Sequence, residues 1–134
     1  MIVITGAAGF IGSNIVKYLN SKGKNDLILV DDFKNKSSLI NVQYEEKYER
    51  DEFLKAINND FNKKIKGIIH LGACSDTMEK NWEFLKKNNT EYSKKLWNYS
   101  IKNDCSFIYA SSAETYGDGG NGFSDSNKDI KCLL

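Results

Sequence analysis

Three glycines near the amino terminus have the spacing of a phosphate-binding turn. Gly6, Gly9 and Gly12 belong to the stretch Gly-Ala-Ala-Gly-Phe-Ile-Gly, which follows the apolar run at 2–5. In such a turn the first glycine permits the tight bend, the second lets the backbone approach a pyrophosphate, and the third lets the next helix pack against the strand. The helix then offers free N–H groups to the anion. The spacing therefore indicates a pyrophosphate site.

An acidic pair completes this pattern further along the chain. Asp31 and Asp32 follow a second apolar run at 27–30, about 20 residues beyond the glycine loop, where an acid binds the adenine ribose. Asp31 by itself favours NAD as the cofactor. A glycine loop that only connects a strand to a helix is the alternative, but strand, loop, helix, strand and acid all occur in the expected order.

Two later segments are predicted to lie at the same edge of the sheet, where the parallel strands end. The segment His70–Ser75 contains small residues that let a cofactor cross close to the backbone, and Ser111–Gly117 offers hydroxyls to a substrate oxygen. A turn rich in small polar residues is the alternative for the latter. His70 and Cys74 are weaker candidates for catalysis: a packed histidine is the simpler interpretation, and no second histidine is available to activate the thiol.

Apolar periodicity predicts alternating strands and helices. Strands are expected at 2–5, 27–30, 42–44, 65–71 and 107–110, and helices at 10–22, 51–61 and 81–102. Asn88, Asn89 and Tyr92 interrupt the apolar positions of the last helix, and residues 117–129 have the composition of a loop. The alternation predicts an α/β fold, a Rossmann-type doubly wound parallel sheet with strand order 3-2-1-4-5, incomplete at its C-terminal end.

Length and composition limit the classes of function. The 134 residues predict a single domain over 1–134, and a net charge of +1 gives no indication of a nucleic-acid partner. No apolar run approaches the ~20 residues of a membrane span. The three cysteines lack a metal-ligand spacing, so no metal site is expected. Cytoplasmic location follows from these features as an expectation.

The loops taken together resemble a known family, the extended short-chain dehydrogenases/reductases that act on nucleotide sugars. Within it the chain is most similar to the ADP-L-glycero-D-manno-heptose 6-epimerases. The segments that carry this closer resemblance are Gly72–Ser75, Asn88–Asn89, Tyr92–Lys94 and Tyr109–Gly117. The resemblance implies an isomerase of lipopolysaccharide or capsule heptose synthesis. Such an enzyme inverts C6 of an ADP-heptose, with a bound NADP that takes a hydride and returns it to the opposite face.

The resemblance also implies roles for individual positions. The pyrophosphate would be bordered by Phe10 and Ile11, the adenosine ribose would lie by Asp31 and Asp32, and Ser112 would hold the reacting hydroxyl. The other implied cofactor contacts are Leu71, Gly72, Ala73, Cys74, Ser75 and Asn88.

Cofactor choice and partners are further implications of the resemblance. It implies NADP, with NAD as the alternative, an ADP-sugar substrate, and a homo-oligomer for the full-length family. Ser38 stands where the family has a lysine near the 2′-phosphate, so Lys34, Lys36 or Arg50 would take its place.

One departure from the family pattern concerns the catalytic base. The family's Tyr-x-x-x-Lys pair does not follow Ser112, because Gly120 stands four residues after Tyr116. We therefore expect the chain to correspond to the N-terminal cofactor part of a larger enzyme, without the substrate domain and inactive alone. The alternatives are another nucleotide-sugar epimerase or dehydratase, and a non-catalytic dinucleotide-binding module.

Overall fold

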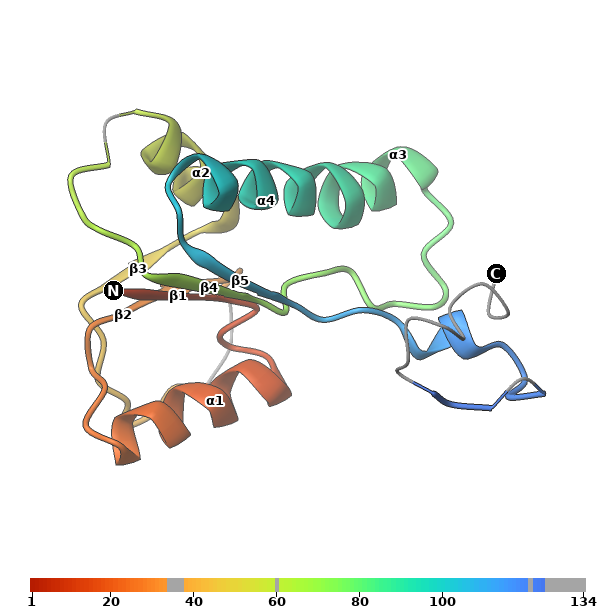
Figure 1. Ribbon diagram of the computed structural model, residues 1–134, viewed down its shortest axis with the longest axis horizontal. Coiled ribbons are helices and arrows are strands. Elements are labelled where there is room, and N and C mark those ends of the chain that lie inside the picture. Colours follow the sequence, from red (N-terminus) through yellow and green to blue (C-terminus); the bar gives the residue numbers. More distant parts are fainter. Residues whose placement is uncertain (34–37, 60, 121, 125–134) are drawn as a thin grey trace.

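The computed structural model describes residues 1–33, 38–59, 61–120 and 122–124. Figure 1 shows one sheet between two layers of helices. Its strands are β1 (Ile2–Thr5), β2 (Leu27–Val30), β3 (Glu46–Tyr48), β4 (Gly67–His70) and β5 (Ser106–Tyr109). They are ordered β3-β2-β1-β4-β5, and each neighbouring pair is parallel. The predicted α/β fold and strand order are therefore confirmed.

Helices cover both faces of this sheet (Figure 1). One face carries α1 (Phe10–Ser21), and the other carries α2 (Arg50–Asn58), α3 (Trp82–Leu85) and α4 (Tyr92–Lys102). A π-helical segment, η1 (Lys86–Glu91), joins α3 to α4, and a short 3₁₀ turn, η2 (Ala113–Tyr116), follows β5. Among the described residues, no helix has the length and apolar character needed to cross a bilayer.

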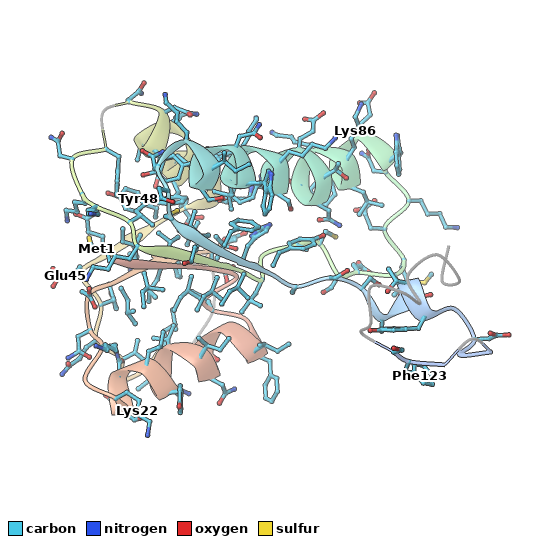
Figure 2. All side chains as sticks on the ribbon, in the orientation of Figure 1. Met1, Lys22, Glu45, Tyr48, Lys86 and Phe123 are labelled. Atoms are coloured by element: carbon cyan, nitrogen blue, oxygen red, sulfur yellow. The ribbon has the colours of Figure 1, made fainter. Side chains whose placement is uncertain are left out.

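The core consists of two apolar layers, one on each side of the sheet. Alternate strand residues point to opposite faces, so Val3 and its neighbours in register, Ile28 and Ile68, face α2 and α4. Ile4 and Leu29 face α1 instead. Figure 2 shows side chains filling the space on both sides. Because the central strands are covered on both faces, their sequences are continuous apolar runs.

The prediction of a strand at 42–44 is wrong. The third strand of the sheet is β3, at Glu46–Tyr48. Val42 packs on the α1 side of the sheet, whereas Glu46–Tyr48 pairs in parallel with β2. As the edge strand, β3 is partly exposed and contains Glu46 and Lys47. It therefore lacks the apolar run by which the buried strands are identified.

The helix predicted at 51–61 is shorter than expected. It begins at Arg50 behind a capping box, in which the carboxylates of Glu49 and Glu52 accept each other's backbone N–H groups, and it ends at Asn58. Phe61 lies beyond the helix, although its ring packs edge-on against Phe53 at 6.3 Å. Phe61 thus supplies an apolar position to the core without belonging to the helix.

The long helix predicted at 81–102 consists of three pieces. It begins after Asn81, whose Oδ1 accepts the N–H of Phe84 at 3.0 Å. Asn88 and Asn89, which interrupt the apolar pattern, lie in the π-helical segment η1. The interruption in the sequence therefore marks a real change of helix type, of a kind frequent at functional sites.

Candidate functional site

A cleft of about 880 Å³ lies at the carboxyl ends of the strands. This volume is within the range of sites that hold cofactors. Its walls come from the glycine loop, the ends of β2 and β3, the loop after β4, and the helical layer of α3, η1 and α4. The lining residues are Thr5, Gly6, Gly9, Phe10, Ile11, Gly12, Val30, Asp31, Asp32, Glu49, Arg50, Asp51, Leu71, Gly72, Ala73, Cys74, Ser75, Phe84, Asn88, Tyr92 and Ala110.

The structure brings together the cofactor residues predicted from sequence. All of those that fall in the described part of the chain line this one cleft. Lys34 and Lys36 lie outside the described residues. Five separate segments thus converge on the edge of the sheet at which an open parallel sheet binds its ligand.

Backbone atoms pack closely around Gly6 and Gly12 of the glycine loop. Gly6 has a φ of +69°, which favours glycine, and a Cβ there would lie 2.8 Å from the backbone nitrogen of Gly72. A Cβ on Gly12 would lie only 2.1 Å from the carbonyl oxygen of Gly6. The first turn of α1 therefore sits directly on the loop, with the N-terminus of that helix at the cleft.

Asp31 fastens the end of β2 to the glycine loop. Its carboxylate accepts the backbone N–H of Ala8 at 2.8 Å and that of Asp32 at 2.7 Å. Ser38 holds the same part of the loop, because its hydroxyl donates to the carbonyl oxygen of Ala8 at 2.6 Å. The negative charge of Asp31 is thus fixed beside the loop, where the ribose of a dinucleotide would lie.

Arg50 is held in the cleft by three neighbours. Its Nε donates to Asp51 at 3.1 Å, another guanidinium nitrogen donates to Oδ1 of Asn88, and the guanidinium lies 5.8 Å from the ring centroid of Tyr92. The hydrogen bond from Arg50 is the main cause that lowers the pKa of Asp51. Arg50 reaches this place because it follows β3, which pairs with β2.

Asn88 has a buried donor at the cleft without a partner. The residue is 4 % exposed, and its Nδ2 makes no hydrogen bond to the described protein atoms. A buried amide without a partner is costly, so an acceptor is expected beside it. The glycine loop at the N-terminus of α1, which lines the cleft, and this free donor together fit a dinucleotide.

Ser112 does not line the cleft in this structure. Its hydroxyl accepts the N–H of Glu114 at 3.2 Å and so caps η2, while Ala110 is the lining residue nearest to it in sequence. No group of three or more histidine, cysteine or carboxylate side chains among the described residues could hold a metal ion.

Several lining residues were missed by sequence reasoning. Glu49 and Asp51 line the cleft because they follow β3 on either side of Arg50, and of these three only the arginine was selected from sequence, for its charge. Phe84 and Tyr92 come from the helical layer, where no pattern of spacing distinguishes a cleft residue from a core residue. A correct placement of β3 is the one observation that could have found the first pair.

Comparison with known proteins matches the chain to one family of epimerases and dehydratases. The NAD dependent epimerase/dehydratase family matches residues 2–131. The ADP-L-glycero-D-manno-heptose-6-epimerase of Brachyspira hyodysenteriae is 42% identical over 133 residues, which are 96% of this chain and 42% of that protein. The protein of the same name from Cupriavidus pinatubonensis is 41% identical over 120 residues, 87% of this chain and 36% of that protein.

A solved structure agrees with these relatives. The crystal structure of the Helicobacter pylori ADP-L-glycero-D-manno-heptose-6-epimerase matches with a TM-score of 0.74 and 25% sequence identity, covering 98% of this chain and 48% of that one. The resemblance drawn from the sequence is thus confirmed. The chain spans less than half the length of the relatives it matches.

Proposed function

Because the chain belongs to the NAD dependent epimerase/dehydratase family, we propose that its cleft binds a nicotinamide dinucleotide for the epimerisation of a nucleotide sugar. The observation that carries this proposal is the glycine loop, in which Gly6 and Gly12 allow the turn and α1 to pack tightly against each other while Gly9 lines the cleft at the N-terminus of α1. The absence of a side chain at Gly9 lets a pyrophosphate come close to the backbone. Calorimetric titration of the chain with NADP and NAD tests it, and no heat from either cofactor contradicts it.

The substrate we propose is an ADP-glycero-manno-heptose, inverted at C6 by transient oxidation and re-reduction. The support is the identity of more than 40% to two proteins named as 6-epimerases of this sugar. The bound dinucleotide supplies the hydride chemistry. The residues of this chain would bind and orient: the N-terminus of α1 would face the pyrophosphate, and Asn88 would offer its free donor. Ser112 lies outside the cleft lining and caps η2, so its role in holding the reacting hydroxyl is proposed from the family resemblance alone.

We expect the 134-residue chain to bind the cofactor without turnover. Oxidation of an alcohol needs a positioned base, which supplies roughly 10²–10⁴-fold, and no Tyr-x-x-x-Lys pair stands after Ser112. The assay is incubation with ADP-heptose and NADP, followed by chromatographic separation of the C6 epimers. Steady turnover, after exclusion of host epimerase, contradicts this expectation.

We propose NADP as the cofactor because of the position of Arg50. Its guanidinium lies at the same edge as Asp31, where an arginine accommodates a 2′-phosphate. Replacing Arg50 with alanine is expected to weaken NADP about tenfold, because charge-assisted hydrogen bonds contribute about 1.5–3 kcal/mol, and to change NAD affinity less than about twofold. Calorimetric titration measures both.

A matched variant controls for the loss of a cation. Lys55→Ala removes an exposed positive charge from the same helix, outside the cleft, and it is expected to leave both affinities unchanged. Equal weakening of NADP and NAD by Arg50→Ala means that Arg50 does not contact the 2′-phosphate. NAD, which Asp31 favours, is then the proposed cofactor.

A further inference from the structure

His70 is a buried polar residue to which the proposed function gives no role. It ends β4 and is 2 % exposed. Its Nδ1 lies 2.5 Å from the hydroxyl of Thr5, and its Nε2 lies 2.8 Å from the hydroxyl of Ser93. The ring thus joins the strand that precedes the glycine loop to the first turn of α4, on opposite sides of the cleft floor.

The directions of the hydrogen bonds assign the proton on this ring. The Ser93 hydroxyl donates to the carbonyl oxygen of Asn89 at 2.5 Å, so it accepts from His70, and Nε2 carries the proton. Nδ1 is then the acceptor for the Thr5 hydroxyl, whose oxygen in turn accepts the N–H of Gly72 at 3.1 Å. The contact to Ser93 thus places a proton on Nε2. The ring is neutral because it is buried, which lowers the pKa of His70 to about 4, so Nδ1 accepts from the Thr5 hydroxyl.

The same chain of hydrogen bonds holds the loop after β4. One end of the chain is the N–H of Gly72. Its other end is the backbone carbonyl of Asn89, and the side chain of the same residue accepts the N–H of Cys74 at 2.8 Å and donates to the carbonyl oxygen of Cys74 at 3.0 Å. Residues 71–75 have no helix or strand of their own. Their position in the wall of the cleft therefore depends on these contacts and on the close packing of Gly72 against Gly6.

We infer that His70 is a positioning residue of the dinucleotide site, which fixes the loop Leu71–Ser75 between the glycine loop and α4. The inference rests on the proposed function. Aromatic rings surround the imidazole, with centroids of Tyr92, Phe107 and Tyr109 at 5.8, 6.0 and 5.8 Å. Among the described residues no charged group hydrogen-bonds to the ring, so its hydrogen bonds are those to the two hydroxyls.

The variant His70→Phe tests this role. It keeps an aromatic ring of similar size and removes both ring hydrogen bonds. We expect the dissociation constant for the dinucleotide to rise about tenfold, the effect of losing hydrogen bonds of ordinary strength that order a cleft wall. Leu27→Val is the matched control, because Leu27 is a buried core residue at the opposite end of the strands. It is expected to lower stability without changing the dissociation constant.

Measurements on the cofactor-free chain make the test independent of binding. The chain has one histidine, so its ¹⁵N resonances report the Nε2–H form directly. Amide hydrogen exchange of Gly72 and Cys74 is expected to be at least about tenfold faster in His70→Phe and Ser93→Ala than in the wild type. Leu27→Val is expected to leave the exchange of Gly72 relative to Ile4 unchanged. Ser93→Ala serves if His70→Phe does not fold.

The outcomes separate this inference from the proposed function. If the wild-type chain binds no dinucleotide but the two amides exchange faster in the variants, the proposed function fails and His70 still positions the loop. If the wild type binds, and neither the dissociation constant nor the exchange rates change in the variants, the positioning role is overturned. A ring that carries no proton on Nε2 overturns it as well, because the contact to Ser93 needs that proton.

Discussion

Replacement of Gly12 by alanine is expected to abolish dinucleotide binding and to lower the free energy of unfolding by about 3 kcal/mol. The added Cβ would lie 2.1 Å from the carbonyl oxygen of Gly6 and 2.9 Å from the Cα of Ala7. Both are backbone atoms, so no side-chain rotation relieves the overlap. Alanine favours a helix over glycine by about 1 kcal/mol, which is too small to offset the displacement of α1 from the loop.

Urea unfolding and calorimetric titration measure the two effects of this change. The matched control is Gly67→Ala, the same substitution in β4, where a Cβ would lie 3.5 Å from the carbonyl oxygen of Ser106. That distance is ordinary contact, so the control is expected to retain dinucleotide binding. Wild-type affinity in Gly12→Ala would show that the loop is not the pyrophosphate site.

Acidification is expected to destabilise the fold through His70 before the carboxylates titrate. Burial lowers the pKa of His70 from 6.5 to about 4, so the unfolded chain takes up a proton at a pH where the folded chain does not. The stability from the neutral ring is complete above pH 6.5 and is lost as the pH falls toward 4. Between about pH 7.5 and about pH 5 the loss is about 2 kcal/mol.

The variant His70→Phe isolates the contribution of this histidine to the pH dependence of stability. Urea unfolding followed by the fluorescence of Trp82 and Trp97 is measured at both pH values. The free energy of unfolding of the wild type is expected to fall between the higher and the lower pH. That of His70→Phe is expected to stay the same. The lowered pKa values of Glu46 and Asp51 place their own losses at lower pH. Parallel pH dependence in the two proteins would show that the imidazole is not the titrating group.

The sequence was sufficient for the architecture because each central strand is a continuous apolar run. Leu27–Val30 is buried along its whole length, and its position between a helix and an acidic pair leaves little ambiguity. The edge strand β3 was not predictable in the same way. Its three residues are held by pairing with β2 and by the packing of Tyr48, and neither is encoded in a local pattern.

The cleft residues that belong to sequence motifs were predictable. Those that are brought together by tertiary packing were less so. The glycines and Asp31 follow from spacing alone, since a tight turn and a strand end restrict the residue types. The network around His70 was not predictable, because Thr5, His70 and Ser93 are distant in sequence and meet only in the folded sheet. The interpretation of the single histidine as a packed residue is correct, since His70 is buried.

The π-helical segment η1 has a consequence for how this helical layer tolerates insertions and deletions. Successive residues of an α-helix point about 100° apart, so one residue more or fewer rotates everything before it relative to everything after. Asn88 reaches Arg50 while Asn89 reaches Cys74, and both contacts depend on the wider turn between α3 and α4. A π-helical turn contains about one residue more than an α-helical turn, so deleting Lys86 would let the segment close into a regular α-helix while Trp82–Leu85 keeps nearly the same orientation. The extra residue is therefore absorbed locally, and a deletion there is expected to change the contacts of Asn88 and Asn89 more than the wall that contains Phe84.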